Sequence, residues 1–149
     1  MAMKLVTGYE TWSELDLLTG LIIGEARGET TSGKIGVALT AKTRAENPRW
    51  WGRNWREVIL CRNQFSCWLD HNADVIREAY RHNGQPWKDA LRIAEEVYCG
   101  CTVDFIGKPT HYHALSVSPA WAAKMQRLAK MGNHIFYRDP AELKCEVRK

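Results

Sequence analysis

The hydrophobic pattern of this sequence changes once, at Gly100, and this change limits the folds that the chain can adopt. Before Gly100, apolar residues recur at helical spacing in four segments, and Asn54 begins a further brief helix. We place the four helices at 13–27, 33–44, 73–81 and 86–99. After Gly100, residues 110–114 and 134–137 are typical of short strands, with an amphipathic segment at 119–128 between them. The sequence therefore predicts an α+β domain that is mainly helical, with a small antiparallel sheet at its C-terminal end.

Two features of the helical half bear on its packing. The second helix carries small residues, which permit another element to approach it closely. These residues are Gly36, Ala38 and Ala41. The segment 47–55 mixes Trp and Arg with turn-forming residues, so we predict an exposed loop or short turn there, and 64–68 follows as a loop.

The length of the chain indicates how many domains it forms, and its net charge indicates the kind of partner that it favours. A chain of 149 residues is long enough to bury a core as one domain, which we place at 1–149. The net charge of +4 favours a polyanionic partner, and nucleic acid, an anionic membrane surface and an anionic cell wall all remain open. Because no long apolar run occurs, we expect no membrane insertion.

The cysteines and the N-terminus indicate a compartment. The number of cysteines is odd, so they cannot all pair within the chain, and the spacing of Cys99 and Cys101 is tighter than the usual zinc or redox CxxC. We therefore expect free thiols in a protein made in a reducing compartment. The N-terminal residues include no apolar signal-peptide core, so we expect no secretory signal.

Glu25 is the most informative residue for chemistry. It shares a helical stripe with apolar residues and is expected to face the interior or the floor of a cleft. Those apolar residues are Leu18, Leu21 and Ile22. Burial and the negative end of the helix dipole both favour a protonated carboxyl, which is what a general acid requires. The alternative is a surface glutamate that pairs with Arg27 or Arg44.

A second carboxylate, Glu29, follows four residues later. If the helix persists past Gly28, Glu29 lies on about the same side as Glu25. A general base, a nucleophile, and a solvated or capping residue all remain open for it.

Four separated blocks of sequence form a more specific pattern. The first is GEARGE at 24–29 with GKIGVA at 33–38, the second is QFS at 64–66, the third runs from Gly100 to Tyr112, and the fourth combines Trp121 with GNHIFY at 132–137. In this order, and over about 15–138, they resemble the SleB-like cell wall hydrolases, the family of the spore-cortex-lytic enzymes. The sequence departs from the family pattern at Thr43 and in the unusually aromatic loop that contains Trp50.

The resemblance implies a lysozyme-like domain that cleaves the peptidoglycan glycan strand between N-acetylmuramic acid and N-acetylglucosamine. It implies a lytic transglycosylase, in which the 6-hydroxyl of muramic acid attacks C1 and one carboxyl, here Glu25, acts as both acid and base. It also implies a monomer that needs no cofactor. The residues expected to bind substrate are Glu29, Gln64, Ser66, Tyr112 and His134.

Three other interpretations remain open. His111 and His113 alternate on one strand and, with His134, would suit a zinc-dependent amidase that cuts the peptide stem. Cys67 with a histidine would form a nucleophilic pair, although lone cysteines are more often buried and inert. Arginines interleaved with Trp would suit a protein that binds nucleic acid or another polyanion without catalysis. These arginines are Arg44, Arg49, Arg53 and Arg56.

The resemblance and the expected lack of a signal together indicate a bacteriophage endolysin. Such a protein is made in the cytoplasm and reaches the cell wall through holin-type lesions in the membrane. Its partner would be the glycan strands of bacterial peptidoglycan, and we expect no nucleic-acid partner.

Overall fold

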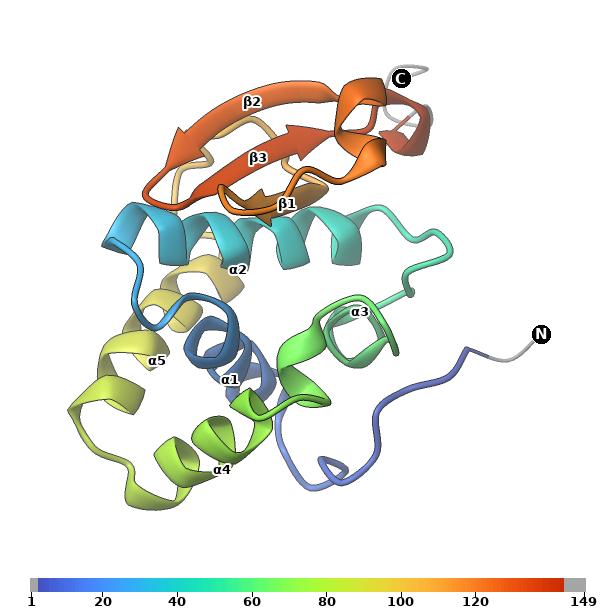
Figure 1. Cartoon of the computed structure of the whole chain (residues 1–149). Coiled ribbons are helices and arrows are strands. Elements are labelled where there is room, and N and C mark those ends of the chain that lie inside the picture. The colour runs from blue at the N-terminus through green and yellow to red at the C-terminus, as the bar shows by residue number, and fades with distance from the viewer. Residues whose placement is uncertain (1–2, 144–149) are drawn as a thin grey trace.

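The helices and the sheet form separate layers in the computed structural model, which describes residues 3–143 (Figure 1). The sheet lies over one side of α2, and the helices α1, α4 and α5 lie on the other side of α2. The helices are α1 (Glu14–Ala26), α2 (Thr31–Glu46), α3 (Trp55–Leu60), α4 (Asn72–His82) and α5 (Gln85–Tyr98), and the strands are β1 (His111–Ala114), β2 (Gln126–Met131) and β3 (His134–Arg138). The predicted α+β architecture with the helices first is confirmed.

Side-chain caps explain where three of the helices begin. Ser13 accepts the backbone N–H of the residue three positions on, and Asn54 does the same at α3. Thr30 caps α2 by accepting the backbone N–H of Gly33 at 3.2 Å. Because of this cap, α2 begins at Thr31, two residues before the predicted start.

The sheet contains a strand that the sequence pattern did not predict. Its order is β1-β3-β2 and both pairings are antiparallel, so β2 is an edge strand. The segment 119–128, expected to be only amphipathic, contains a 3-10 helix, η2 (Ala120–Lys124), and the start of β2. An edge strand keeps one row of backbone groups in solvent and is commonly rich in long polar side chains, which weakens its hydrophobic signature.

A glycine on α2 allows the sheet to approach the helix. A Cβ built on Gly36 would lie 2.3 Å from Cζ of Phe136, which is fully buried on β3. The Phe136 ring therefore occupies the space that any larger residue at position 36 would need. The close approach expected from the small residues of this helix is confirmed at Gly36.

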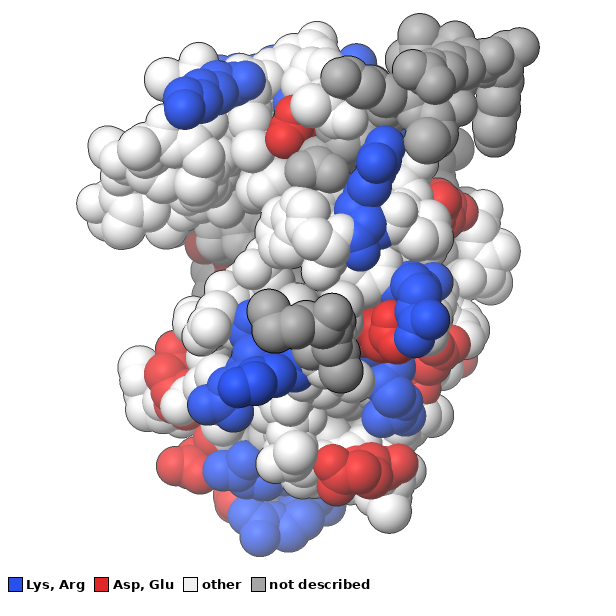
Figure 2. Space-filling model, turned by 90° about the vertical axis from the view of Figure 1, so that its right-hand side faces the viewer, with Lys and Arg blue, Asp and Glu red and all other residues white. Residues whose placement is uncertain are grey.

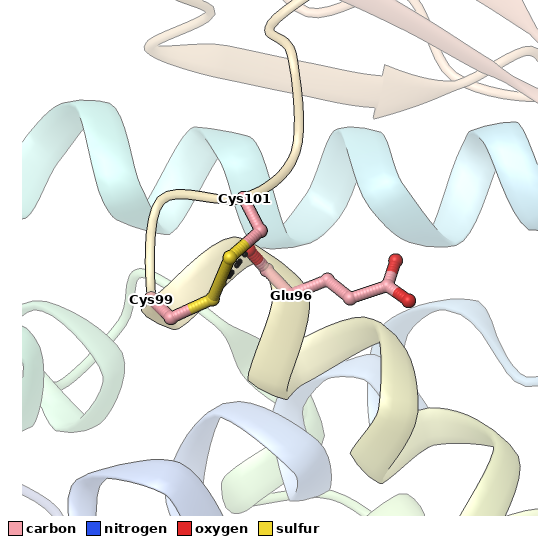
Figure 3. Close-up of a disulfide and its surroundings, with 3 residues drawn as sticks. All are labelled: Glu96, Cys99 and Cys101. Carbon is pink, nitrogen blue, oxygen red and sulfur yellow. Dashed lines mark hydrogen bonds between the residues drawn. A yellow bond between two sulfur atoms is a disulfide. The ribbon is translucent and has the colours of Figure 1, made fainter.

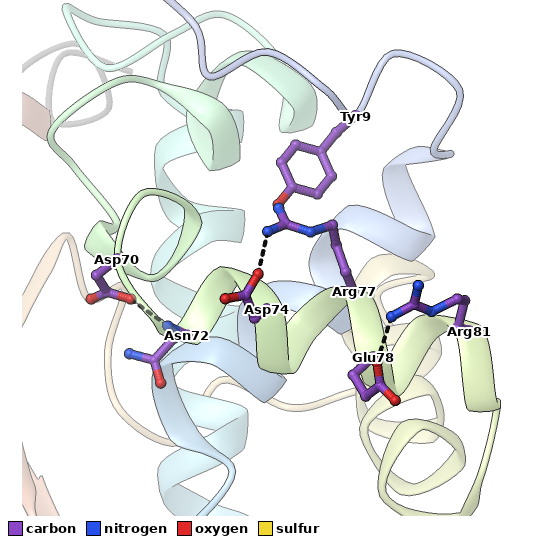
Figure 4. A network of polar contacts seen from close by, with 7 residues as sticks. All are labelled: Tyr9, Asp70, Asn72, Asp74, Arg77, Glu78 and Arg81. Carbon is purple, nitrogen blue, oxygen red and sulfur yellow. Dashed lines mark hydrogen bonds and ion pairs between the residues drawn. The ribbon is translucent and has the colours of Figure 1, made fainter.

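The N-terminal segment is fixed to the helices through Tyr9 (Figure 4). Its ring packs edge-on against Trp12 and Trp68, with centroids 5.0 and 4.7 Å away. Arg77 of α4 donates to the Tyr9 hydroxyl at 2.9 Å and to Asp74 at 2.7 Å. Because burial raises the pKa of Tyr9, its hydroxyl stays protonated at neutral pH.

Two cysteines are paired, which corrects the expectation of free thiols. Cys99 and Cys101 form a disulfide just after α5 (Figure 3). Gly100 between them has φ +79°, and this turn brings the two Cα atoms to 5.6 Å, a spacing that a disulfide permits. Cys61 and Cys67 are free, and Cys145 lies outside the described residues.

The aromatic loop before α3 is only partly exposed. Trp50 is 52% exposed, whereas Trp51 is fully buried and donates from Nε1 to the carbonyl oxygens of Arg44 and Asn47. The expectation of an exposed loop is therefore wrong for Trp51. A buried indole needs an acceptor for its N–H, and the C-terminal carbonyls of α2 provide two.

The predicted loop at 64–68 contains a 3-10 helix, η1 (Ser66–Trp68). None of the helices within 3–143 has the length and the apolar character needed to cross a bilayer.

Candidate active site

The carboxyl group of Glu25 is held by donors from two other elements. Glu25 lies in the last turn of α1 and is partly buried. Its Oε1 accepts a short hydrogen bond from the hydroxyl of Tyr112 on β1, and its Oε2 accepts the backbone N–H of Cys67 in η1 at 3.3 Å. The carboxyl therefore has a fixed orientation, and the expectation that Glu25 faces a cleft rather than bulk solvent is confirmed.

Neither arginine considered as a partner of Glu25 takes that role. Arg27 donates to the carbonyl oxygen of Ile23 at 3.4 Å, within its own helix. Arg44 donates from Nε to the carbonyl oxygen of Thr110 at 2.8 Å. The surface ion pair considered as the alternative for Glu25 is therefore wrong.

Glu25 lies where two hollows meet. On one side is a cleft of about 440 Å³, within the size range of pockets that bind small ligands, and Gln64, Tyr112 and Trp121 line it. On the other side is a hollow of about 360 Å³, lined by residues 24–29 and by His134. An extended polymer that crosses this boundary would present an internal bond to the Glu25 carboxyl.

Gly24 allows η1 to come this close to α1. A Cβ on Gly24 would lie 2.6 Å from both Cβ and Sγ of Cys67 and 2.6 Å from Cδ1 of Ile76. Cys67 is fully buried, and burial, followed by the negative charge of Glu25, raises the pKa of its thiol far above the ordinary range. A thiol that stays neutral is a poor nucleophile, which contradicts the cysteine–histidine alternative.

Arg44 lines the cleft, although it was not among the substrate-binding residues predicted from the sequence. It is 4% exposed, and its guanidinium lies 5.0 Å from the ring centroid of Trp51 and 5.6 Å from that of Phe65. It donates from Nη1 to Oε1 of Gln64 at 3.1 Å. Arg44 shares the buried face of α2 with Val37 at i, i+7 spacing, and this was the available signal.

The residues predicted to bind substrate do not all reach the cleft. Gln64 and Tyr112 line the cleft, and Glu29 and His134 line the hollow on the other side of Glu25. Ser66 is exposed at the start of η1, where its carbonyl oxygen accepts the N–H of Leu69, and it lines neither of these two hollows. Substrate binding by these residues stays a prediction.

Glu29 is engaged in holding the turn between β2 and β3. Its Oε1 accepts the backbone N–H of Asn133 at 2.8 Å, and its Oε2 accepts the Asn133 side-chain amide at 3.3 Å. Its side chain is 10% exposed, and Nδ1 of His134 lies 3.4 Å from Oε1. These contacts stabilise the turn, which differs from both the solvated role and the helix-capping role considered for Glu29 from the sequence.

The three histidines of the zinc hypothesis lie on two faces of the sheet. His134 shares a face with Phe136 and with Tyr112, whose ring centroid is 5.1 Å away. His111 and His113 point to the other face, where both contact Trp121 at 5.1 and 5.8 Å. Neighbouring positions along a strand point to opposite faces, so these three cannot bind one ion, and the zinc amidase hypothesis is wrong.

No group of three His, Cys, Asp or Glu side chains in residues 3–143 is arranged to hold a metal ion.

Burial, followed by the positive charge of Arg44, lowers the pKa of His111 to about 4. His111 is therefore a neutral member of the cleft wall at pH 7.

Two of the four arginines in the polyanion hypothesis stabilise the fold. Arg44 is buried, and Arg56 donates to the carbonyl oxygens of Tyr9 at 3.2 Å and of Trp12. Arg49 and Arg53 lie around a third hollow beside the cleft. The four residues therefore do not form one exposed basic surface.

A fixed carboxyl at the floor of an open groove, with aromatic and amide side chains beside it, is the arrangement expected of an enzyme that cleaves a glycan chain by acid catalysis. The sheet and the helices contribute to this groove together. The fold and the site therefore define a candidate acid-catalysis enzyme whose carboxyl lies in an open groove.

Comparison with known proteins identifies the family. The family model for cell wall hydrolases matches residues 28–137, and the chain belongs to this family. The match begins three residues after Glu25, so it covers the cleft residues of β1 and also Cys67, which donates to Glu25, but not the carboxyl itself. The SleB-like resemblance seen in the sequence is confirmed.

Two solved structures share the fold. The catalytic domain of the germination-specific lytic transglycosylase SleB from Bacillus anthracis is 21% identical, with a TM-score of 0.66, and the alignment covers 84% of this chain and 93% of that domain. The catalytic domain of SleB from Bacillus cereus is also 21% identical, with a TM-score of 0.67 and coverages of 84% and 89%. No curated protein sequence matches this chain.

Proposed function

We propose that this protein is a peptidoglycan lytic transglycosylase, which cleaves the glycan strand between N-acetylmuramic acid and N-acetylglucosamine. The observation that carries the proposal is the Glu25 carboxyl, oriented by Tyr112 and Cys67 at the boundary between two hollows. The name of the Bacillus anthracis relative describes the same activity, and membership of the cell wall hydrolase family agrees with the substrate.

One carboxyl is sufficient for this reaction. Glu25 donates a proton to the glycosidic oxygen as the bond from that oxygen to C1 breaks, and the leaving sugar departs with a new hydroxyl. The 6-hydroxyl of the same muramic acid then bonds to C1, and its proton returns to Glu25. The products are a 1,6-anhydro-muramic acid end and a free sugar end, with no water consumed. Glu29 is not required, in agreement with its contacts to Asn133.

The phenol of Tyr112 supports the reaction by staying protonated. Burial, followed by the negative charge of Glu25, raises its pKa well above the ordinary value, so it remains a donor to Oε1 at neutral pH. This donor fixes one carboxyl oxygen, and the backbone N–H of Cys67 holds the other at 3.3 Å, so the carboxyl keeps one orientation beside the groove.

Gln64 is suited to recognise an acetamido group. Its carbonyl oxygen is occupied by the Arg44 guanidinium, which fixes the orientation of the side-chain amide. The NH₂ end is then available to donate to the carbonyl oxygen of an N-acetyl group in the cleft. His134 and Glu29, which line the hollow on the other side of Glu25, are proposed to contribute to binding there. Substrate binding by Ser66, which lines neither hollow, stays the prediction made from the sequence.

The remaining parts of the proposal concern the setting of the enzyme. We propose that it acts on the cell wall as a monomer without a cofactor. Action as a phage endolysin, released from the cytoplasm through holin-type lesions, stays the prediction made from the sequence.

The test is mass spectrometry of the soluble fragments that wild type and Glu25→Gln release from purified peptidoglycan. We expect anhydro-muramyl products from wild type and none from Glu25→Gln. Glu46→Gln, a matched change at an exposed glutamate at the end of α2, should release the same products as wild type. Reducing ends in place of anhydro ends would mean a hydrolytic muramidase, and freed stem peptides would mean an amidase.

A further inference from the structure

The third hollow, beside the cleft, is a basic groove. It encloses about 1060 Å³ between the N-terminal segment, the loop before α3 and the residues that follow α3, and Figure 2 shows basic side chains interspersed with acidic ones on this face. Its basic side chains are Lys4, Arg49, Arg53 and Arg62. Trp50 and Asn63 line both the basic groove and the catalytic cleft, so the two are continuous.

One of the groove cations, Arg53, is neutralised within the groove. Glu57 is the acid among the groove residues, and it is bound by Arg53, with Nη2 to Oε2 at 3.0 Å and Nε to Oε1 at 3.2 Å. These hydrogen bonds lower the pKa of Glu57, so it stays ionised and neutralises Arg53. Lys4 and Arg62 remain as positive charges of the basic groove.

Lys4 and Arg62 place two like charges at opposite positions of the basic groove. They lie opposite each other, because Leu5 pairs with Cys61 in an antiparallel bridge and the N–H of Arg62 donates to the carbonyl oxygen of Lys4 at 3.0 Å. Both side chains are exposed, and neither forms a hydrogen bond or an ion pair with another residue of the described chain. Like charges placed opposite each other across paired strands destabilise the fold. Local conflicts of this kind are typical of functional sites.

The chemistry of the substrate indicates what the basic groove binds. The sugar rings of peptidoglycan are neutral, and the strand carries its negative charge on the carboxylates of the peptide stems. A strand with its scissile bond at Glu25 would extend along the cleft, past Trp50, and bring a stem to the basic groove. On the basis of the function proposed above, we propose that the basic groove binds the peptide-stem carboxylates and makes the enzyme selective for peptide-bearing strands.

The experiment measures binding without turnover, so that it does not depend on the reaction proposed for Glu25. Glu25→Gln protein is sedimented with insoluble peptidoglycan that has been freed of teichoic acid. One half of the peptidoglycan is untreated, and in the other half carbodiimide and ammonia convert the stem carboxylates to carboxamides. We expect about tenfold weaker binding to the amidated material, since two exposed ion pairs together change an affinity by roughly 2- to 30-fold.

Charge-reversal variants locate the effect. In the same background, Lys4→Glu/Arg62→Glu should bind untreated peptidoglycan about tenfold more weakly, with a smaller loss on the amidated form. Lys88→Glu/Arg92→Glu changes the net charge equally on α5, away from this face, and should bind like its parent (Figure 1). Lys4→Gln/Arg62→Gln gives a milder version if the reversed pair does not fold, as judged by circular dichroism.

The inference would be overturned by equal binding of the parent to both forms of peptidoglycan, by an equal loss from the reversed pair on both forms, or by an equal loss from the α5 pair. The variants are also sedimented with walls that retain teichoic acid, and a loss seen only there would overturn the inference too, since the ligand would then be a phosphodiester. Failure of the proposed function would appear separately, as the absence of anhydro products from wild type.

Discussion

Tyr112→Phe should slow catalysis while leaving the fold intact. The substitution removes one hydroxyl, which donates to Oε1 of Glu25, and leaves the backbone N–H of Cys67 at 3.3 Å as the remaining donor to the carboxyl. A hydrogen bond to a charged group contributes about 1.5–3 kcal/mol. If that contribution is needed in the transition state, kcat falls roughly 10- to 150-fold, at about 1.4 kcal/mol for each factor of ten. KM should change little, since the phenol is occupied by Glu25.

The assay follows the release of anhydro-muramyl products from peptidoglycan under initial-rate conditions. Tyr137→Phe is the matched control, because the Tyr137 hydroxyl lies 2.9 Å from Nε2 of His113 on the other face of the sheet and not near Glu25. We expect Tyr137→Phe to keep kcat within about threefold of wild type, as for a change outside the reacting groups. A wild-type kcat in Tyr112→Phe, or an equal loss in Tyr137→Phe, would refute the role given to the Tyr112 phenol.

Further predictions address the fold, the second carboxylate and the response to pH. Gly36→Ala should lower Tm by about 2–10 °C, because the new methyl group overlaps the Phe136 ring and overpacking costs roughly 1–3 kcal/mol. Thermal melts followed by circular dichroism measure this change. A Tm equal to that of wild type would mean that the ring moves freely. Glu29→Gln should keep more than about a tenth of the wild-type kcat, since one side-chain oxygen still accepts from the turn at Asn133; a loss as complete as that in Glu25→Gln would indicate a two-carboxylate mechanism. The pKa of His111 is about 4 in the folded protein, below its ordinary value of 6.5, so the unfolded chain takes up a proton first and the stability of the fold decreases as the pH drops from 6.5 toward 4. In His111→Gln this part of the decrease in Tm should be absent. Identical profiles of Tm against pH for the variant and wild type would contradict the argument.

The helical half of the fold could be predicted because its signals are local. Apolar spacing of three and four residues and capping side chains such as Ser13 and Asn54 act within one turn of the helix that they specify. The position of Glu25 at the floor of a groove followed from the same periodicity. The order of the sequence blocks then indicated the family.

The sheet and the site were harder to predict, because their interactions join residues far apart in the sequence. Tyr112 and Glu25 are separated by 87 positions, and no local pattern indicates that the phenol and the carboxyl meet. Arginine is usually a surface residue, yet Arg44 is buried, because the carbonyl oxygen of Thr110 accepts its Nε–H and the ring of Trp51 packs against its guanidinium. The edge strand β2 acquires its structure through pairing with β3.

The sequence by itself determined the α+β class, the helices, the acidic residue at the groove and the family resemblance. Only the tertiary structure decided which groups surround Glu25, that the three histidines lie on two faces of the sheet, and that Cys99 and Cys101 meet across the turn at Gly100. Local patterns report the conformation of one segment. The chemistry of the site depends on strand register and on side chains from several segments, and these are fixed only when the segments pack together.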